Sequence, residues 1–348
     1  MITPGQAPVA VTGASGFVGT HIVRELLARG HHVRACVRDP KNPKKTAHLV
    51  ALAEGLPGEL SLAQGDLMKP GSYDEAFKGA GGVIHVAAIV QLAAKDGQRD
   101  IVDPSVVGTR NVLDSVKKSG SVQRVVHTSS VAAIYGRPIQ GKIYTEADWC
   151  DDATVKNNPY AVAKREAERL AARFPEEVNG EISVVHINPS LVLGPVYTEA
   201  HVWASPSIIR DLLVGTFPAN PQLHFSMVDA REVARAHAEA MERPNVSGRY
   251  ILAAETGWVQ DAAKTLAERF PSYRIKTGKL PNLLLYAAAM VDKRISFSMV
   301  RELAGRTVEF DNARSRSELG IEYRSVADSL TDTVNAMVEG GWVTPRTR

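Results

Sequence analysis

Two reactive side chains, Tyr160 and Lys164, lie four positions apart in the run "NNPYAVAKREAERLAARF" (residues 157–174). We predict that a helix begins in this run and places the phenol and the ammonium one turn apart. A neighbouring positive charge favours the tyrosinate and lowers the phenol pKa. A tyrosine with a pKa near neutrality can exchange a proton with a carbonyl oxygen. On most helices such a pair is only surface decoration, so the rest of the chain has to decide.

A serine lies where it could complete this chemistry. The motif "HTSS" (127–130) ends a predicted strand just before the helix that carries Tyr160. In a doubly wound sheet, the carboxyl ends of strands and the beginnings of helices line the ligand crevice. Ser129, Tyr160 and Lys164 are therefore expected to converge beside a cofactor, with the Ser129 hydroxyl holding a carbonyl oxygen.

A glycine-rich loop near the N-terminus indicates what that cofactor is. In "VTGASGFVG", Gly13, Gly16 and Gly19 follow a predicted strand and open an amphipathic helix. The first glycine permits a tight turn, the second lets the backbone approach a pyrophosphate, and the third lets the helix pack closely on the sheet. The helix N-terminus offers free N–H groups to that pyrophosphate. The alternative is a tight turn without a ligand.

The end of the second predicted strand, in "VRACVRDP", bears on the choice between NAD and NADP. NAD enzymes usually place an acid there for the ribose 2′-hydroxyl. Here Arg38 lies near the strand end and Arg34 further back, and an arginine fork suits a 2′-phosphate. Lys44 and Lys45 could add positive charge. Asp39 is the argument for NAD, and we predict NADP.

Other polar residues carry weaker signals. "GDL" (65–67) is compatible with an adenine contact by Asp66 and Leu67, although an aspartate at a strand end is often a cap. Histidines on predicted strands are interpreted as core residues, and two in the later region as possible pocket residues: His85, His127 and His186, then His201 and His224. The spacing of Cys, His, Asp and Glu suggests no metal site.

Strands and helices alternate over the first 190 residues, which predicts an α/β fold with a doubly wound parallel sheet, a Rossmann fold. We predict a dinucleotide-binding domain over 1–190 that returns around 223–254. A smaller C-terminal substrate lobe would be formed by 191–222 and 255–348. Residues 190–207 are interpreted as a loop.

Composition excludes several classes of protein. The chain has 348 residues, a net charge of only +3, and no basic stripe that would suggest nucleic acid. Cys36 and Cys150 cannot form a disulfide framework, so a reducing compartment is expected. The apolar segment 280–291 is too short to span a bilayer and is interpreted as a buried or partner-facing helix. We expect a cytoplasmic monomer or homodimer without a membrane partner.

Taken in order, "VTGASGFVG", "VRACVRDP", "GDL", "HVAA", "GTRNVLDS", "HTSS", "YAVAK" and "NPSLVLGP" resemble the extended short-chain dehydrogenase/reductases over nearly the whole chain. "VRACVRDP" and the tail "FDNARSRSELGIEYR" are most similar to the branch of dihydroflavonol reductases, cinnamoyl-CoA reductases and microbial aldehyde or ketone reductases. The resemblance implies an NADPH-dependent carbonyl reductase with a small-molecule aldehyde or ketone substrate, able to oxidise the alcohol in reverse.

The resemblance also implies residue roles. Tyr160 would be the general acid, Lys164 would bind the nicotinamide ribose, and Ser129 would orient the carbonyl. The cofactor would be held by Gly13, Gly16, Phe17, Val18, Gly19, Arg38, Lys44, Asp66, Leu67, Ala87, Thr128, Pro189, Val192 and Ser207.

The chain departs from the plant enzymes at two places that border the substrate. It has "HVAAIV" (85–90) where they usually show "HVASP", and the region before Tyr160 also differs. A microbial aldehyde, ketone or ketoester reductase therefore fits better than a flavonoid or CoA-thioester reductase. The alternatives are an NAD-dependent nucleotide-sugar epimerase or dehydratase, a 3β-hydroxysteroid-type dehydrogenase, and a non-enzymatic redox sensor. The individual substrate is not encoded in a readable pattern.

Overall fold

The computed structural model describes residues 2–89, 94–216, 218–291 and 297–347. Its centre is a seven-stranded sheet in which every pair of neighbours is parallel, in the order β10-β7-β5-β4-β1-β2-β3. This confirms the predicted doubly wound sheet. The strands are β1 (Val9–Thr12), β2 (His32–Val37), β3 (Glu59–Gln64), β4 (Gly82–His85), β5 (Arg124–Thr128), β7 (Ser183–Pro189) and β10 (Gly248–Leu252).

The direction of winding reverses between β1 and β4. From β1 the chain builds β2 and β3 on one side, and then crosses to add β4, β5, β7 and β10 on the other. A crevice forms outside the carboxyl ends of the strands at such a point. The glycine loop follows β1 and Ala87 follows β4, so both lie at this crevice.

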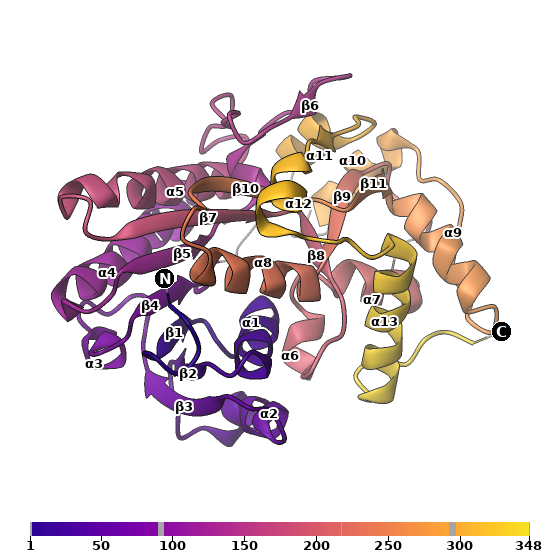
Figure 1. Cartoon of the computed structure of the whole chain (residues 1–348). Coiled ribbons are helices and arrows are strands. Elements are labelled where there is room, and N and C mark those ends of the chain that lie inside the picture. Colours follow the sequence, from indigo (N-terminus) through magenta and orange to yellow (C-terminus); the bar gives the residue numbers. More distant parts are fainter. Residues whose placement is uncertain (1, 90–93, 217, 292–296, 348) are drawn as a thin grey trace.

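Helices cover both faces of the sheet (Figure 1). One apolar cluster contains residues of α1 and α8, including Ile22, Leu26 and Val233, and a second contains residues of α4 and α5, including Val112 and Phe174. With both faces covered, β1, β4 and β5 are buried along their whole length, as parallel strands require. The covering helices are α1 (Phe17–Ala28), α2 (Pro43–Ala53) and α8 (Ala230–Glu242), then α3 (Asp74–Phe77), α4 (Asp103–Ser119) and α5 (Pro159–Glu177).

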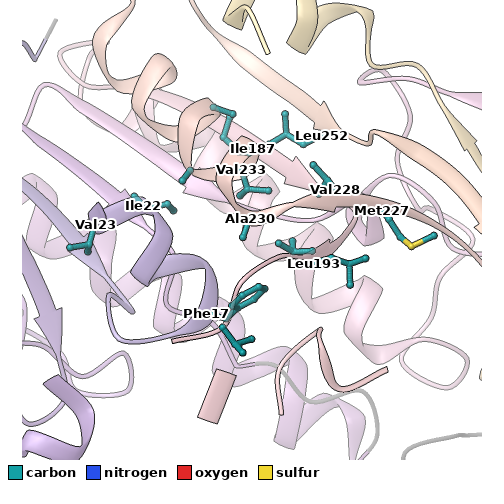
Figure 2. Close-up of a cluster of buried hydrophobic side chains, with 14 of the residues drawn as sticks. Phe17, Ile22, Val23, Ile187, Leu193, Met227, Val228, Ala230, Val233 and Leu252 are labelled. Carbon is teal, nitrogen blue, oxygen red and sulfur yellow. The ribbon is translucent and has the colours of Figure 1, made fainter. Parts of the chain in front are cut away.

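A three-stranded sheet adjoins the carboxyl edge and consists of β8 (Leu191–Leu193), β9 (His224–Asp229) and β11 (Glu255–Trp258). Figure 2 shows how its apolar side chains share one cluster with the main sheet and its helices, among them Phe17, Ile187, Leu193, Met227, Val228, Ala230 and Val233. The expectation of a loop over 190–207 was therefore wrong. The segment 190–207 contains β8 and α6 (Glu199–Val202), which are too short to show a periodic pattern.

The segment 223–254 divides between the two sheets. Helix α8 packs on the main sheet and β10 forms its edge, whereas β9 pairs with β8 and β11. The remaining elements are η1 (Gln98–Val102), η2 (Val131–Ala133), β6 (Ile143–Tyr144), α7 (Ser207–Leu213), α9 (Val259–Arg269), α10 (Asn282–Val291), α11 (Phe297–Leu303), β12 (Glu309–Phe310), α12 (Ala313–Leu319) and α13 (Val326–Glu339).

Helix α10 covers most of the apolar segment predicted to be buried or partner-facing. Leu285 is buried, whereas Leu283 is 80% exposed and Leu284 53% exposed. Among the described residues, no helix is both long enough and apolar enough to cross a membrane. Val90, the last residue of "HVAAIV", lies outside the described residues.

Candidate active site

The glycine loop is packed so closely that two of its positions require glycine. Gly13 has a φ of +66°, and a Cβ there would lie 2.8 Å from the Ala87 nitrogen. A Cβ on Gly19 would lie 2.2 Å from the Gly13 carbonyl oxygen. At Gly16 the corresponding distance is 3.3 Å, which is tight but less severe. The loop is thus held against the residue that follows β4.

The N-terminus of α1 has the features of an anion-binding site. Gly16 is the N-cap, no side chain caps the helix, and its first turn contains no acidic residue. The first N–H groups of a helix have no partner within it, and they carry the positive end of the dipole. Phe17 is buried and Val18 partly buried beside them. A cradle with no room for a Cβ and with free N–H groups fits the pyrophosphate of a dinucleotide.

The basic residues in β2 and after it separate into two groups. The Arg34 side chain is bonded within the protein, because its guanidinium donates to the carbonyls of Ala76 (2.7 Å) and Lys78 (2.9 Å). The Arg38 side chain is exposed. Lys44 is also exposed, in the first turn of α2.

The side chains of Asp39 and Asp66 each accept a hydrogen bond from the backbone nitrogen two residues later. Asp39 accepts a hydrogen bond from the Lys41 nitrogen (3.1 Å), and Asp66 accepts one from the Met68 nitrogen (3.0 Å). Leu67 is buried close beneath α4, where a Cβ on Gly108 would lie 2.5 Å from its Cγ. Asp66 therefore closes its own turn and does not cap the next helix, α3, whose N-cap is Tyr73; its half-buried carboxylate lies beside the carboxyl end of β3.

Tyr160 and Lys164 lie at the beginning of α5, against the end of β5. The helix starts at Pro159, a favourable first position, and Asn158 caps it by accepting from the Ala161 nitrogen (3.0 Å). The Lys164 ammonium donates to the Thr128 carbonyl (3.3 Å), and the Ser130 hydroxyl lies beside the Tyr160 phenol, whose pKa it lowers. These contacts join the helix to the strand end that carries "HTSS".

The serine beside Tyr160 is not the one expected. The Ser129 hydroxyl is buried and donates to the carboxylate of Glu168, away from the phenol. Ser130 faces Tyr160, and its oxygen also accepts from the Ala132 nitrogen (3.1 Å) as the cap of η2. Ser129 as the orienting hydroxyl is thus at odds with the geometry, because a full hydrogen bond to a buried carboxylate directs it elsewhere.

The pKa of Tyr160 moves in the direction opposite to the expected one. Burial raises it, and the neighbouring Ser130 hydroxyl lowers it only in part. Burial also lowers the pKa of Lys164 to about 8, with the negative charge of Glu168 acting in the other direction. Desolvation of the phenol therefore outweighs the charge effect that the spacing suggested.

Thr128 and Pro189 lie at the carboxyl edge of the main sheet, whereas Val192 and Ser207 lie in later elements of the chain. The Thr128 hydroxyl is hydrogen-bonded to His237 (2.7 Å), Pro189 ends β7, and Val192 lies in β8. Ser207 begins α7. Of the expected cofactor residues, the structure brings Gly13 to Ala87 and Lys164 to Thr128 through direct contacts.

The three histidines interpreted as core residues are buried, which confirms that interpretation: His85, His127 and His186 are 2%, 4% and 3% exposed. His201 is buried as well and donates to the Ser15 carbonyl of the glycine loop (3.1 Å). His224 accepts from the Val308 nitrogen (3.2 Å). His201 therefore braces the cofactor loop and does not line an open pocket.

An open cavity of about 590 Å³ lies between the loop before α5 and the helices α10 and α11. Asn157, in its wall, is three residues before Tyr160 in the chain. Tyr286 and Phe297 supply a stacked aromatic pair, with ring centroids 6.2 Å apart. Its lining residues are Thr154, Lys156, Asn157, Tyr286, Phe297 and Arg301. Among the described residues, no group of three or more Cys, His, Asp or Glu side chains could hold a metal ion.

Comparison with known proteins identifies the family. Residues 9–253 match the NAD dependent epimerase/dehydratase family. Cinnamoyl-CoA reductase CAD2 of Medicago truncatula is 34% identical over 336 residues, covering 95% of each chain. The chain belongs to this family, the extended short-chain dehydrogenase/reductases, as its motifs suggested, and is an NAD(P)-dependent oxidoreductase.

Two solved structures show the same fold. Gre2 of Candida albicans, in complex with NADPH, superimposes with a TM-score of 0.78 at 28% identity, covering 96% of this chain and 99% of that one. Yeast methylglyoxal/isovaleraldehyde reductase Gre2, also complexed with NADPH, gives a TM-score of 0.76 at 26% identity and covers 97% and 100%.

Proposed function

We propose that this protein is an NADPH-dependent carbonyl reductase that reduces a small aldehyde or ketone to the alcohol. The observation that carries the proposal is the grouping of Ser130 and Tyr160 at the carboxyl edge of the sheet, with Lys164 one helical turn further along and bonded to the Thr128 carbonyl. This is a proton donor held beside the edge where the glycine loop lies. The reductases named above as relatives and the NADPH in both Gre2 structures support the same assignment.

The cofactor would be held by the glycine loop and by the basic residues after β2. The first turn of α1 would take the pyrophosphate, Arg38 and Lys44 the 2′-phosphate, and Lys164 the nicotinamide ribose. Asp66, Leu67, Ala87, Thr128, Pro189, Val192 and Ser207 are proposed as its further contacts. When bound, the nicotinamide supplies the hydride.

The proton that the carbonyl oxygen needs would come from a side chain of the protein. A raised pKa keeps the Tyr160 phenol protonated at neutral pH, which is the form a proton donor needs. As negative charge builds on the carbonyl oxygen, the phenol donates its proton to that oxygen. Ser130 hydrogen-bonds the same oxygen and holds it in line with Tyr160, a role that we transfer from Ser129. Lys164, with a pKa of about 8, is positively charged at neutral pH.

The substrate would enter by the 590 Å³ cavity in front of α5. Its aromatic pair suits an unsaturated or aromatic body, and its open form suits molecules of different size. The name of yeast Gre2 includes methylglyoxal and isovaleraldehyde, and such aldehydes belong to the first compounds to test. Cys36 and Cys150, both buried and unpaired, fit the reducing cytoplasm that we propose as the location.

The test is NADPH oxidation measured with aldehydes, diketones, ketoesters and flavonoid ketones. We expect turnover with at least one of these classes and free exchange of the cofactor. A nucleotide-sugar epimerase or dehydratase on the same fold would retain its NAD tightly through the cycle. Purified protein that carries bound NAD, and consumes no NADPH with any carbonyl, would contradict the proposal.

A further inference from the structure

The site contains a buried acid that the proposed mechanism does not use. Glu168 is fully buried on α5, at positions i+4 and i+8 from Lys164 and Tyr160, so the three residues share one face of the helix. A buried carboxylate is costly unless it is paired and hydrogen-bonded, so its partners show what it does.

Three strands of the main sheet supply those partners. The Ser129 hydroxyl, which follows β5, and the Asn188 amide in β7 (2.8 Å) donate to one carboxylate oxygen. The Arg249 guanidinium in β10 donates to the other. Arg249 is fixed in turn, because it donates to the Glu146 carbonyl (2.8 Å) and lies 3.9 Å from the centre of the Trp149 ring.

The same contacts lead back to the catalytic serine. Asn188 donates from its amide both to Glu168 and to the carbonyl of Ser130 (3.2 Å). Ser129, the neighbour of Ser130, is held by Glu168 directly. The backbone of both serines is therefore fastened to α5 through one carboxylate, and the Ser130 hydroxyl meets Tyr160 on that same helix.

The titratable and polar groups around Lys164 come from its own helix and from two strands. Tyr160 and Glu168 lie on its own helix, the Thr128 carbonyl lies on β5, and His85 and His127 lie on β4 and β5. Burial lowers the pKa of both histidines, that of His85 to about 3, so they are neutral near pH 7. Glu168 is thus the negative charge that acts on the Lys164 ammonium, where it opposes the effect of burial.

We propose that Glu168 is a positioning residue that holds Ser130 against Tyr160 and places a negative charge one helical turn from Lys164. The inference rests on the proposed carbonyl reduction. Arg249 pairs with Glu168 through the carboxylate oxygen that Ser129 and Asn188 do not use.

The pH dependence tests the charge effect. Reduction requires protonated Lys164, so activity should be lost as pH rises through the Lys164 pKa of about 8. In Glu168→Gln the side chain keeps its size and loses its charge, which lowers the Lys164 pKa. The alkaline limb of kcat/KM should therefore move about one unit to lower pH.

The matched control is Glu232→Gln. Glu232 is another buried glutamate and lies on α8, where it pairs with Arg324 (2.6 Å). Among the described residues, it has no contact with Ser130, Tyr160 or Lys164. This variant should lose stability and keep the wild-type limb. An active Glu168→Gln whose limb coincides with those of wild type and the control would overturn the proposal.

A second variant covers the case in which Glu168→Gln does not fold. Ser129→Ala breaks the direct link between Glu168 and Ser129, and it leaves the Asn188 bridge to Ser130 and the ion pair with Arg249 in place. We expect kcat to fall about 10-fold through misplacement of Ser130, with the KM for NADPH and the alkaline limb unchanged. Wild-type kcat in Ser129→Ala would refute the positioning role. Absence of turnover in the wild-type protein would instead count against the proposed function.

Discussion

The two sides of the candidate site are built in different ways. On the cofactor side, the buried strands β1, β4 and β5 end at a loop where a single added Cβ would come within 3 Å of backbone atoms. On the substrate side, α10 and α11 present Leu283 at 80% and Phe297 at 52% exposure. On the proposed function, the close-packed backbone fixes the type of reaction, while the open side chains choose the molecule on which it acts.

The largest effect should come from the proton donor on the packed side. Tyr160→Phe removes one hydroxyl and keeps the ring, so folding and NADPH binding should persist. Because general acid catalysis contributes typically 10²–10⁴-fold, kcat should fall by about that factor. Steady-state kinetics together with NADPH titration by fluorescence would measure both quantities. Near-normal turnover in a variant that binds NADPH would mean that the Tyr160 phenol is not the proton donor.

The next effect separates the two serines. Ser130 touches Tyr160 and Ser129 touches Glu168, so Ser130→Ala should reduce kcat by about 100-fold, as loss of an oxyanion donor does. Ser129→Ala, the matched change at the neighbouring serine, should reduce kcat by only about 10-fold. The comparison of kcat at saturating substrate decides the assignment, and the reverse ranking would restore the role first expected for Ser129.

A smaller effect is expected at the edge of the packed side, where Arg38 is exposed. Arg38→Ala should raise the KM for NADPH about 10- to 100-fold, since a hydrogen bond to a charged group contributes about 1.5–3 kcal/mol. The KM for NADH should change little. Arg34→Ala is the matched control, because Arg34 is bonded to backbone carbonyls, and it should affect stability more than cofactor choice. Equal losses with both cofactors in Arg38→Ala would argue against NADP.

The smallest effect belongs to the open side. Lys156 lines the cavity, and a solvent-exposed charge contributes about 1 kcal/mol or less. Lys156→Ala should therefore change the substrate KM by less than about fivefold and leave kcat and the KM for NADPH unchanged. Carbonyl compounds with and without a carboxylate would sharpen the comparison. A large fall in kcat would show that this wall takes part in the reaction itself.

The same contrast explains what the sequence could predict. The parallel sheet, the glycine loop and the Tyr160–Lys164 pair follow from local patterns, because helical period and the carboxyl edge of a sheet fix where they lie. "HTSS" did not reveal which serine meets Tyr160, since that depends on Glu168 drawing Ser129 away. The signal was present in the spacing of Tyr160, Lys164 and Glu168 on one helical face, and it was missed.

Other features could not be predicted because tertiary packing decides them. Burial, which determines the direction of the Tyr160 pKa, involves several elements far apart in the chain. The strand β8 has three residues and α6 has four, too few to show a period. Their positions follow from pairing with β9 and from contact with the glycine loop, where His201 of α6 bonds to Ser15.

The most direct test of the account follows the hydride itself. The wild-type protein would be given NADPH carrying deuterium at the transferred position of its nicotinamide, together with the best carbonyl substrate of the panel. Mass spectrometry of the product should show an alcohol with one deuterium on the former carbonyl carbon, formed in equal amount to the NADP released. Recovery of unreduced substrate or its epimer, with the deuterium still on the cofactor, would contradict the central claim.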